Sequence, residues 1–222
     1  MLKVVVFDSG YGGELFADRL KDEFPLIEII RVIDWRNSDT YLKNPRKARL
    51  AAEKALRPYI GRANLIVVAN YLLASTSLKY FEHKYKSQNF LGLELPYPGI
   101  SKRKRTTILT TKAMARTISY HNYLFRLKGK TDTICLDHWV ELIDDGELTE
   151  QMVYREIEKF YIKYHYKPVE IIVACSQFCD AVPLLKNTLT KNLKIHDGFD
   201  DTIAKVFKIL KIRGGTGKKK KH

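Results

Sequence analysis

The chain has 222 residues, of which 45% are apolar, so it can bury one large core or two smaller ones. No apolar run approaches the roughly 18 residues of a membrane-spanning helix, and residues 1–3 lead directly into a short apolar run rather than a signal peptide. We therefore expect a soluble, cytoplasmic protein with no membrane segment.

The formal net charge of +14 indicates an anionic partner. Lys218 to Lys221 contribute part of this charge, and we expect residues 214–222 to be a flexible basic tail. Lys102 to Arg105 form a second cluster, which we interpret as a solvated loop. Because the sequence contains no nucleic-acid-binding module, a small anionic metabolite is favoured over nucleic acid as the partner.

The three cysteines, Cys135, Cys175 and Cys179, show no C-x-x-C spacing. An odd number without paired spacing predicts neither a disulfide framework nor a zinc site. The histidines are also scattered without ligand spacing, so no metal site is predicted. Free thiols in a reducing compartment fit this pattern.

Short apolar runs alternate with helical patterns along the chain. The first half predicts strands at 3–7, 27–33, 65–69 and 90–95, helices at 15–24, 46–59 and from about 74 onward, and a polar loop at 34–44. The second half predicts strands at 106–110, 131–136, 171–174 and 193–196, helices at 113–127, 150–164, 181–189 and 200–210, and a loop or short helix at 137–145. This alternation predicts an α/β fold with mainly parallel sheets.

An internal repeat divides the chain. Residues 65–70 read L-I-V-V-A-N and residues 171–176 read I-I-V-A-C-S, so that Ala69 stands where Cys175 stands. The repeat predicts two similar α/β lobes that face each other across a cleft. We assign residues 1–97 and 190–213 to the first lobe and residues 98–189 to the second.

Polar and nucleophilic side chains gather where the predicted strands end. In open parallel sheets, ligands bind outside the carboxyl ends of the strands, so these side chains predict a site. Glycines at 10, 12 and 13 let the backbone after the first strand approach a bound anion. The candidate residues are Asp8, Ser9, Asn70, Thr111, Cys175, Ser176 and Gln177.

Six motifs in this order carry a family resemblance. They are D-S-G-Y-G-G at 8–13, G-L-E-L-P at 92–96, T-T-K-A-M-A-R-T-I-S-Y at 110–120, C-L-D-H-W-V-E-L-I-D-D-G at 135–146, A-C-S-Q at 174–177 and I-H-D-G-F-D-D-T at 195–202. With these motifs, and with the alanine and asparagine at 69–70, the chain resembles glutamate racemases of the aspartate/glutamate racemase superfamily. The resemblance extends from residue 4 to about residue 206.

This resemblance implies an isomerase that uses no cofactor and no metal, with glutamate as the default substrate. In such enzymes two cysteines on opposing lobes move the Cα proton, one as thiolate and one as thiol. Cys175 matches one of these cysteines, and Asp8 matches the acid of the first motif. Positions that match the substrate shell are Ser9, Asn70, Thr111 and Ser176. A homodimer is a further implication of the resemblance.

The chain also departs from the family pattern. Ala69 stands where the family has its first cysteine, and an alanine cannot transfer a proton. Gln177 replaces a histidine, so a polar contact remains but not a titratable one. Tyr71 and Met114 stand where small hydroxyl residues are usual, which predicts a tighter and less polar pocket.

Three functional hypotheses follow from the resemblance and the departures. The first is a racemase that uses Cys175 together with a non-cysteine partner, for which Asp8 is the best candidate because burial can raise a carboxyl pKa. The second is a one-thiol, decarboxylase-like member of the superfamily, which protonates its intermediate from one face. The third is a catalytically inactive homologue that binds an anion or regulates another process.

Overall fold

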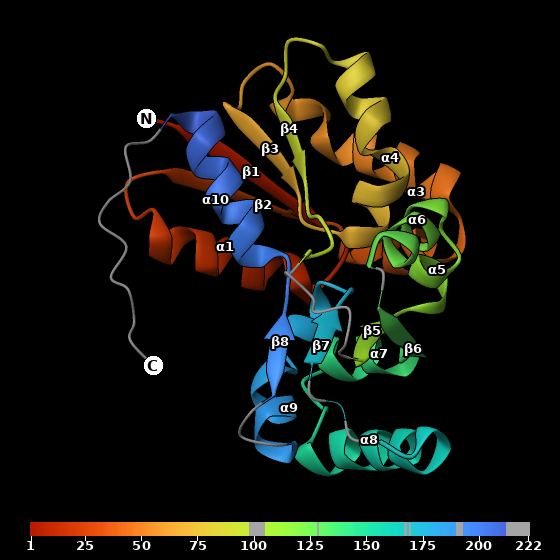
Figure 1. The fold of residues 1–222 in the computed structure, drawn as a ribbon. Coiled ribbons are helices and arrows are strands. Elements are labelled where there is room, and N and C mark those ends of the chain that lie inside the picture. The colour runs from red at the N-terminus through yellow and green to blue at the C-terminus, as the bar shows by residue number, and fades with distance from the viewer. Residues whose placement is uncertain (98–104, 128, 167, 169, 190–192, 212–222) are drawn as a thin grey trace.

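The computed structural model describes residues 1–97, 105–127, 129–166, 168, 170–189 and 193–211. These residues form an α/β fold with two four-stranded sheets, in which all strand pairs are parallel, as the sequence predicts (Figure 1). The predicted tail at 214–222 and residues 102–104 of the second basic cluster lie outside the described residues. No helix in the described part of the chain is long and apolar enough to cross a membrane.

The first sheet has the strand order β2-β1-β3-β4. Its strands are β1 (Lys3–Asp8), β2 (Glu28–Ile33), β3 (Leu65–Val68) and β4 (Phe90–Gly92). Alternate side chains of β1 enter different cores, because successive residues of a strand point to opposite faces. Val4 and Val6 pack with α1 (Tyr11–Glu23) and α10 (Phe199–Leu210), whereas Val5 and Phe7 pack with α3 (Pro45–Leu56) and α4 (Tyr71–Lys84).

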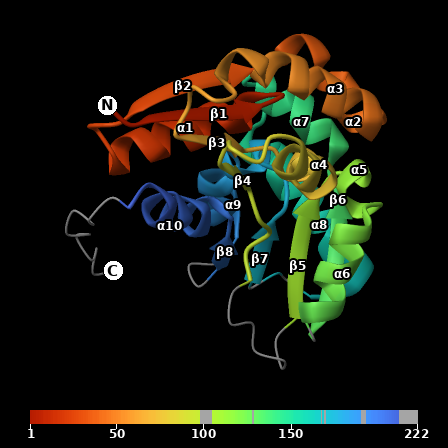
Figure 2. The same ribbon diagram turned by 90° about the horizontal axis from the view of Figure 1, so that it is seen from above.

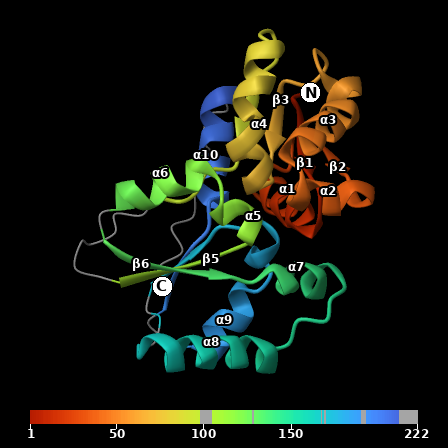
Figure 3. The same ribbon diagram turned by 90° about the vertical axis from the view of Figure 1, so that its right-hand side faces the viewer.

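The second sheet has the order β6-β5-β7-β8. Its strands are β5 (Arg105–Thr110), β6 (Lys130–Cys135), β7 (Glu170–Val173) and β8 (Lys194–His196). Ile172 packs toward α6 (Ile118–Leu127), and Val173 packs toward α7 (Asp137–Asp144), α8 (Glu150–Tyr164) and α9 (Val182–Thr188). Figure 3 shows α6 on one side of this sheet and α8 with α9 on the other.

The remaining elements are short. They are α2 (Ser38–Lys43), α5 (Lys112–Ala115) and the 3-10 turns η1 (Trp35–Asn37), η2 (Arg57–Tyr59) and η3 (Gln177–Cys179). α4 contacts both α5 and α6, so these helices line the place where the two sheets with their helices meet (Figure 2).

Several elements differ from the prediction. The polar segment 34–44 was expected to be a loop, but it contains η1 and α2, because Tyr41 is buried and its hydroxyl donates to Asp34. α4 begins three residues earlier than predicted, because Asn70 caps it by accepting from the Leu73 backbone amide at 2.8 Å. The predicted helix at 113–127 is divided into α5 and α6.

Within the segment 190–213, which the sequence assigns to the first lobe, the strand and the helix that the structure describes pack with different sheets. β8 pairs with β7 and therefore belongs to the second sheet. α10, which follows it, packs against β1 with Phe199, Ile203 and Val206 in the core of the first sheet. The chain therefore crosses between the sheets after His196, and the lobe boundaries themselves remain a prediction.

Candidate active site

The candidate site lies where the carboxyl ends of β1, β3, β5 and β7 converge. Asn70 follows β3 and is fixed by its cap on α4, and Thr111 follows β5 and caps α5 by accepting from the Met114 amide at 3.3 Å. Cys175 and Ser176 follow β7 at the start of a 3-10 turn. Capping gives the side chains of Asn70 and Thr111 a fixed direction, because each must point back at the first turn of its helix.

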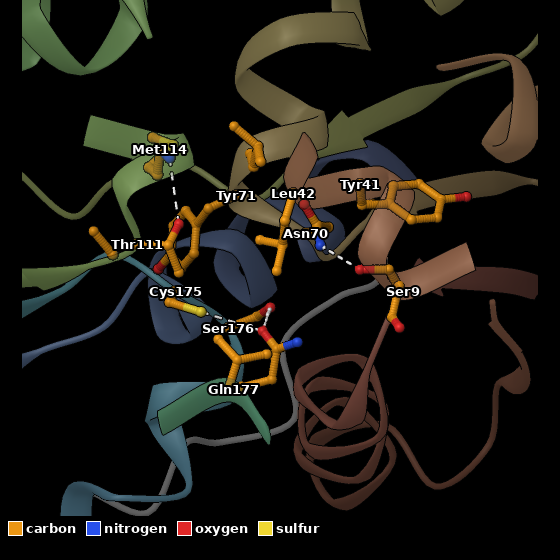
Figure 4. Close-up of a pocket in the computed structure, with 14 residues that line it drawn as sticks. Ser9, Tyr41, Leu42, Asn70, Tyr71, Thr111, Met114, Cys175, Ser176 and Gln177 are labelled. Atoms are coloured by element: carbon orange, nitrogen blue, oxygen red, sulfur yellow. Dashed lines mark hydrogen bonds between the residues drawn. The ribbon is translucent and has the colours of Figure 1, made fainter. Parts of the chain in front are cut away.

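These residues enclose a cavity of about 30 Å³ (Figure 4). Six of the seven residues predicted from the sequence line it: Ser9, Asn70, Thr111, Cys175, Ser176 and Gln177. The cavity has room for about two water molecules, whereas small-molecule pockets are typically roughly 300–1,000 Å³. The residues around the site therefore leave far less space than a typical small-molecule pocket.

Asp8 is the predicted residue that does not line the cavity. It is completely buried, and its carboxylate accepts hydrogen bonds from the Ser9 amide at 2.6 Å, Asn70 Nδ2 at 2.8 Å and Ser176 Oγ at 2.9 Å. Burial raises the pKa of Asp8 to about 7, and the three hydrogen bonds oppose this rise. Asp8 thus lies behind the residues that face the cavity and orients them.

Cys175 is the nucleophilic group that faces the cavity. Its thiol donates to Oε1 of Gln177 at 3.2 Å, and only 8% of the residue is exposed. Burial raises the pKa of this thiol to about 12, and backbone amides of Gln177 and Phe178 oppose the rise. The thiol is therefore the resting form at neutral pH.

Ala69 occupies the equivalent place after β3. It is completely buried, it does not line the cavity, and its amide donates to the Phe7 carbonyl oxygen at 2.7 Å. One lobe therefore presents a thiol to the cavity, and the other presents no proton-transfer group at the matching position.

Tyr71 and Met114 form an apolar wall of the cavity (Figure 4). The Tyr71 hydroxyl accepts from the Gly198 amide at 2.7 Å, so the ring faces the cavity while its polar end is held by the turn before α10. Met114 is also buried, and its sulfur accepts from Ser75 Oγ at 3.7 Å. Both side chains occupy space that smaller residues would leave open.

Sequence reasoning missed the residues that α2 and α7 contribute. Ser38, Tyr41 and Leu42 line the cavity from α2, inside the segment read as a loop, and Val140 lines it from α7. The adjacent apolar pair at 41–42 in an otherwise polar segment was the available signal. Among the described residues, no group of three His, Cys, Asp or Glu side chains is placed to hold a metal ion.

The two lobes touch closely beside the cavity. A methyl group at Gly12 of α1 would lie 2.5 Å from the backbone carbonyl carbon of Ser176, so only glycine allows this approach. The amide of Tyr11 also donates to Asp144 of α7 at 3.1 Å. The glycines of the first motif therefore bring the start of α1 against the second lobe.

Comparisons with known proteins agree with this geometry. No protein-family model matches the chain. It is 21% identical over 207 residues to the glutamate racemase of Aquifex aeolicus, covering 87% of this chain and 76% of that protein. It is also 21% identical over 213 residues to the glutamate racemase of Lactococcus lactis, covering 92% and 78%.

Solved structures show the same fold. The glutamate racemase of Escherichia coli, solved in complex with L-glutamate, superposes with a TM-score of 0.83 at 16% identity, covering 97% of this chain and 84% of that one. The aspartate racemase of Picrophilus torridus superposes with a TM-score of 0.64 at 15% identity, covering 96% and 95%. The fold and the resemblance to the racemase superfamily predicted from the motifs are thus confirmed.

Proposed function

We propose that the chain is a glutamate racemase-like protein that transfers a proton at one face of the Cα of a small acidic amino acid, with Cys175 as the transferring group and no cofactor. The observation that carries this proposal is the asymmetry of the two strand ends. A thiol follows β7 and faces the cavity, whereas the methyl group of Ala69 follows β3 and does not. The proton therefore leaves and returns on the Cys175 side.

Hydroxyl groups of the site bind the substrate carboxylates by donating hydrogen bonds to them. Ser9 Oγ accepts from Asn70 and Thr111 Oγ1 accepts from the Met114 amide, so the hydrogen of each hydroxyl is available to a ligand. Ser38 adds a third hydroxyl from α2. Donors from both lobes then hold the anion, which requires the lobes to open for entry and to close for binding.

The proton transfer has two steps. The thiolate of Cys175 takes the Cα proton, and the C–H electron pair stays on the substrate, delocalised into the adjacent carboxylate. The resulting thiol then returns a proton to the same face. Because the resting group is the thiol, the cycle begins when it gives its proton to a water molecule, and the ammonium group of a bound amino acid favours this step by lowering the pKa of the thiol.

The protonated state of Cys175 favours a second candidate function, decarboxylation. In this reaction the bond from Cα to a carboxylate breaks, carbon dioxide leaves, and the electron pair remains on Cα. The Cys175 thiol then donates its proton to that carbon, and water restores the thiol. A thiol whose pKa is about 12 is already in the state that this reaction needs.

The test is exchange of the Cα proton in deuterated buffer, followed by NMR, with L- and D-glutamate offered separately to the full chain. We expect exchange of one enantiomer without inversion, and loss of exchange in Cys175→Ala. Inversion of both enantiomers would contradict the one-face proposal. If neither enantiomer exchanges while the protein is folded, glutamate is excluded as substrate, and release of carbon dioxide from methylmalonate tests the second candidate.

A further inference from the structure

A groove of about 420 Å³ adjoins the catalytic cavity. Leu42 of α2 and Leu72 of α4 line both spaces, so these two side chains form the partition between them. Figure 4 shows Leu42 above Ser176 and Gln177, with its side chain directed into the site. The groove is therefore the space that a molecule in the cavity meets if it extends past these leucines.

Three segments lead outward from the cavity to the groove. α2 lines the cavity at Tyr41 and the groove at Lys43. α4 lines the cavity at Tyr71 and the groove at Thr76. In the second lobe, Thr111 and Met114 line the cavity, and residues 116–119 line the groove. Both lobes thus contribute to the groove, as they do to the cavity.

The groove is positively charged. The residues that the structure describes around it include Lys43 and Arg116 and no Asp or Glu. Arg116 has no ion pair or side-chain hydrogen bond among the described residues. Lys43 pairs with Asp39 at 2.5 Å, but both side chains are more than 70% exposed, so this pair is weak. Both cations are available to an anion.

The hydroxyl groups around the groove already donate hydrogen bonds to backbone carbonyl oxygens. Thr76 donates to the Leu72 carbonyl oxygen, Thr117 to that of Met114, and Ser119 to that of Ser75. The free donors of the groove are therefore its two cations. A guanidinium group binds a carboxylate with two parallel hydrogen bonds, which suits it to recognise such a group at the end of a ligand.

We propose that the substrate is longer than glutamate: an acidic amino acid extended by an arm that ends in a carboxylate, which the groove binds against Arg116 and Lys43. This inference rests on the proposed function, which places the reacting carbon at Cys175. The inner cavity of about 30 Å³ accommodates little beyond the reacting centre, while the groove has the volume for an arm. Leu42 and Leu72 between the two polar ends suit the methylene groups of such an arm.

The test is isothermal titration of the full chain with two γ-linked dipeptides that differ only in the charge of the arm. The γ-glutamylglycine probe ends in a carboxylate, and γ-glutamylglycinamide has a neutral amide in its place. We expect the charged probe to bind about tenfold more tightly, and Arg116→Gln to remove this difference, because a hydrogen bond to a charged group at a half-open site contributes that much. Lys43→Gln should have a smaller effect in the same direction.

The matched control is Arg57→Gln, because Arg57 is an exposed arginine at the far end of α3 and does not line the groove. It removes the same charge and should leave both affinities unchanged. Equal affinity of the two probes, no binding of the charged probe, or the same loss in Arg57→Gln as in Arg116→Gln would overturn the inference.

Probe binding tests this inference and Cα-proton exchange tests the proposed function. The two can fail separately, because the titration requires no turnover. If glutamate exchanges its Cα proton through Cys175 but Arg116 has no effect on the charged probe, the inference fails and the proposed function stands. If the charged probe binds through Arg116 and no substrate exchanges, the groove assignment stands and the catalytic proposal fails.

Discussion

Ser176 donates a hydrogen bond from its Oγ to Oδ2 of Asp8 at 2.9 Å, and the two residues are 168 positions apart in the sequence. The bond joins the end of β7 in the second sheet to the end of β1 in the first. Asn70 donates to the other carboxylate oxygen at 2.8 Å. One buried carboxyl group therefore connects the lobes and fixes two of the side chains that line the cavity, so we regard Asp8 as a positioning residue.

Asp8 should make stability depend on pH. Its pKa is raised from 3.8 to about 7, so the folded protein retains this proton at pH values where the unfolded chain has released it. The free energy of unfolding should therefore fall as the pH rises from about 4 to about 7, by at most about 4 kcal/mol. Urea unfolding of the wild type and Asp8→Asn across this range measures the effect, because asparagine has no proton to lose.

The control for Asp8→Asn is Asp22→Asn, which makes the same chemical change at an exposed position of α1. It should retain the pH dependence of the wild type. If Asp8→Asn retains it as well, the ionisation of Asp8 is not its source.

The thiol of Cys175 should react slowly with iodoacetamide at neutral pH. With a pKa of about 12, its thiolate fraction at pH 8 is on the order of 10⁻⁴. The labelling rate at this residue, followed by mass spectrometry of its peptide, should rise about tenfold per pH unit between pH 7 and pH 10. The urea-unfolded chain is the reference, because its thiols titrate near their ordinary pKa. Rapid labelling of the folded protein at pH 7 would show that the thiolate is already present.

The sequence predicts the positions of the site residues because strand ends are visible in a hydrophobic pattern. Parallel strands of one sheet place their carboxyl ends together, which brings Asn70 near Ser9 and Thr111 near Ser176. The hydrophobic pattern does not show, however, whether a side chain at a strand end faces the cavity or lies behind it. Asp8 lies behind the cavity because its three hydrogen-bond donors surround it, and this arrangement depends on contacts between residues far apart in the chain.

The same limit explains the other differences. The sequence of a three-residue strand such as β8 does not indicate which sheet the strand joins, so its pairing with β7 could not be predicted. The volume of the cavity is also a tertiary property. Tyr71 limits it because the Gly198 amide, from a distant segment, holds the tyrosine hydroxyl.

Gly12→Ala should separate the lobes or destabilise their closed arrangement. The added methyl group meets the backbone and side chain of Ser176, and backbone cannot move aside without shifting the second lobe. We expect a loss of about 1–3 kcal/mol in the free energy of unfolding, the usual cost of overpacking. Gly10→Ala is the matched comparison, because its methyl group meets the far end of the flexible Gln177 side chain and should cost less. Equal stability of Gly12→Ala and the wild type would contradict the close approach of the lobes.

Ala69→Cys should convert one-face exchange into racemisation. The substitution adds a single sulfur at the end of β3, where the chain otherwise offers a methyl group, and gives each lobe one thiol. Because position 69 is completely buried, the sulfur has to displace neighbouring side chains, and we expect a loss in stability of about 1–3 kcal/mol. The expected gain is inversion of both L- and D-glutamate, measured by polarimetry.

The design of this experiment separates a second thiol from a mere change of shape. Ala69→Ser places a side chain of similar size at the same position without a group that ionises near neutral pH, so it should remain limited to one face. The double variant Ala69→Cys, Cys175→Ala should invert neither enantiomer, because racemisation needs a proton donor and a proton acceptor on opposite faces of Cα. If folded Ala69→Cys still exchanges only one enantiomer, the missing thiol is not what restricts the site, and the small cavity enclosed by Tyr71 and Met114 becomes the explanation to test.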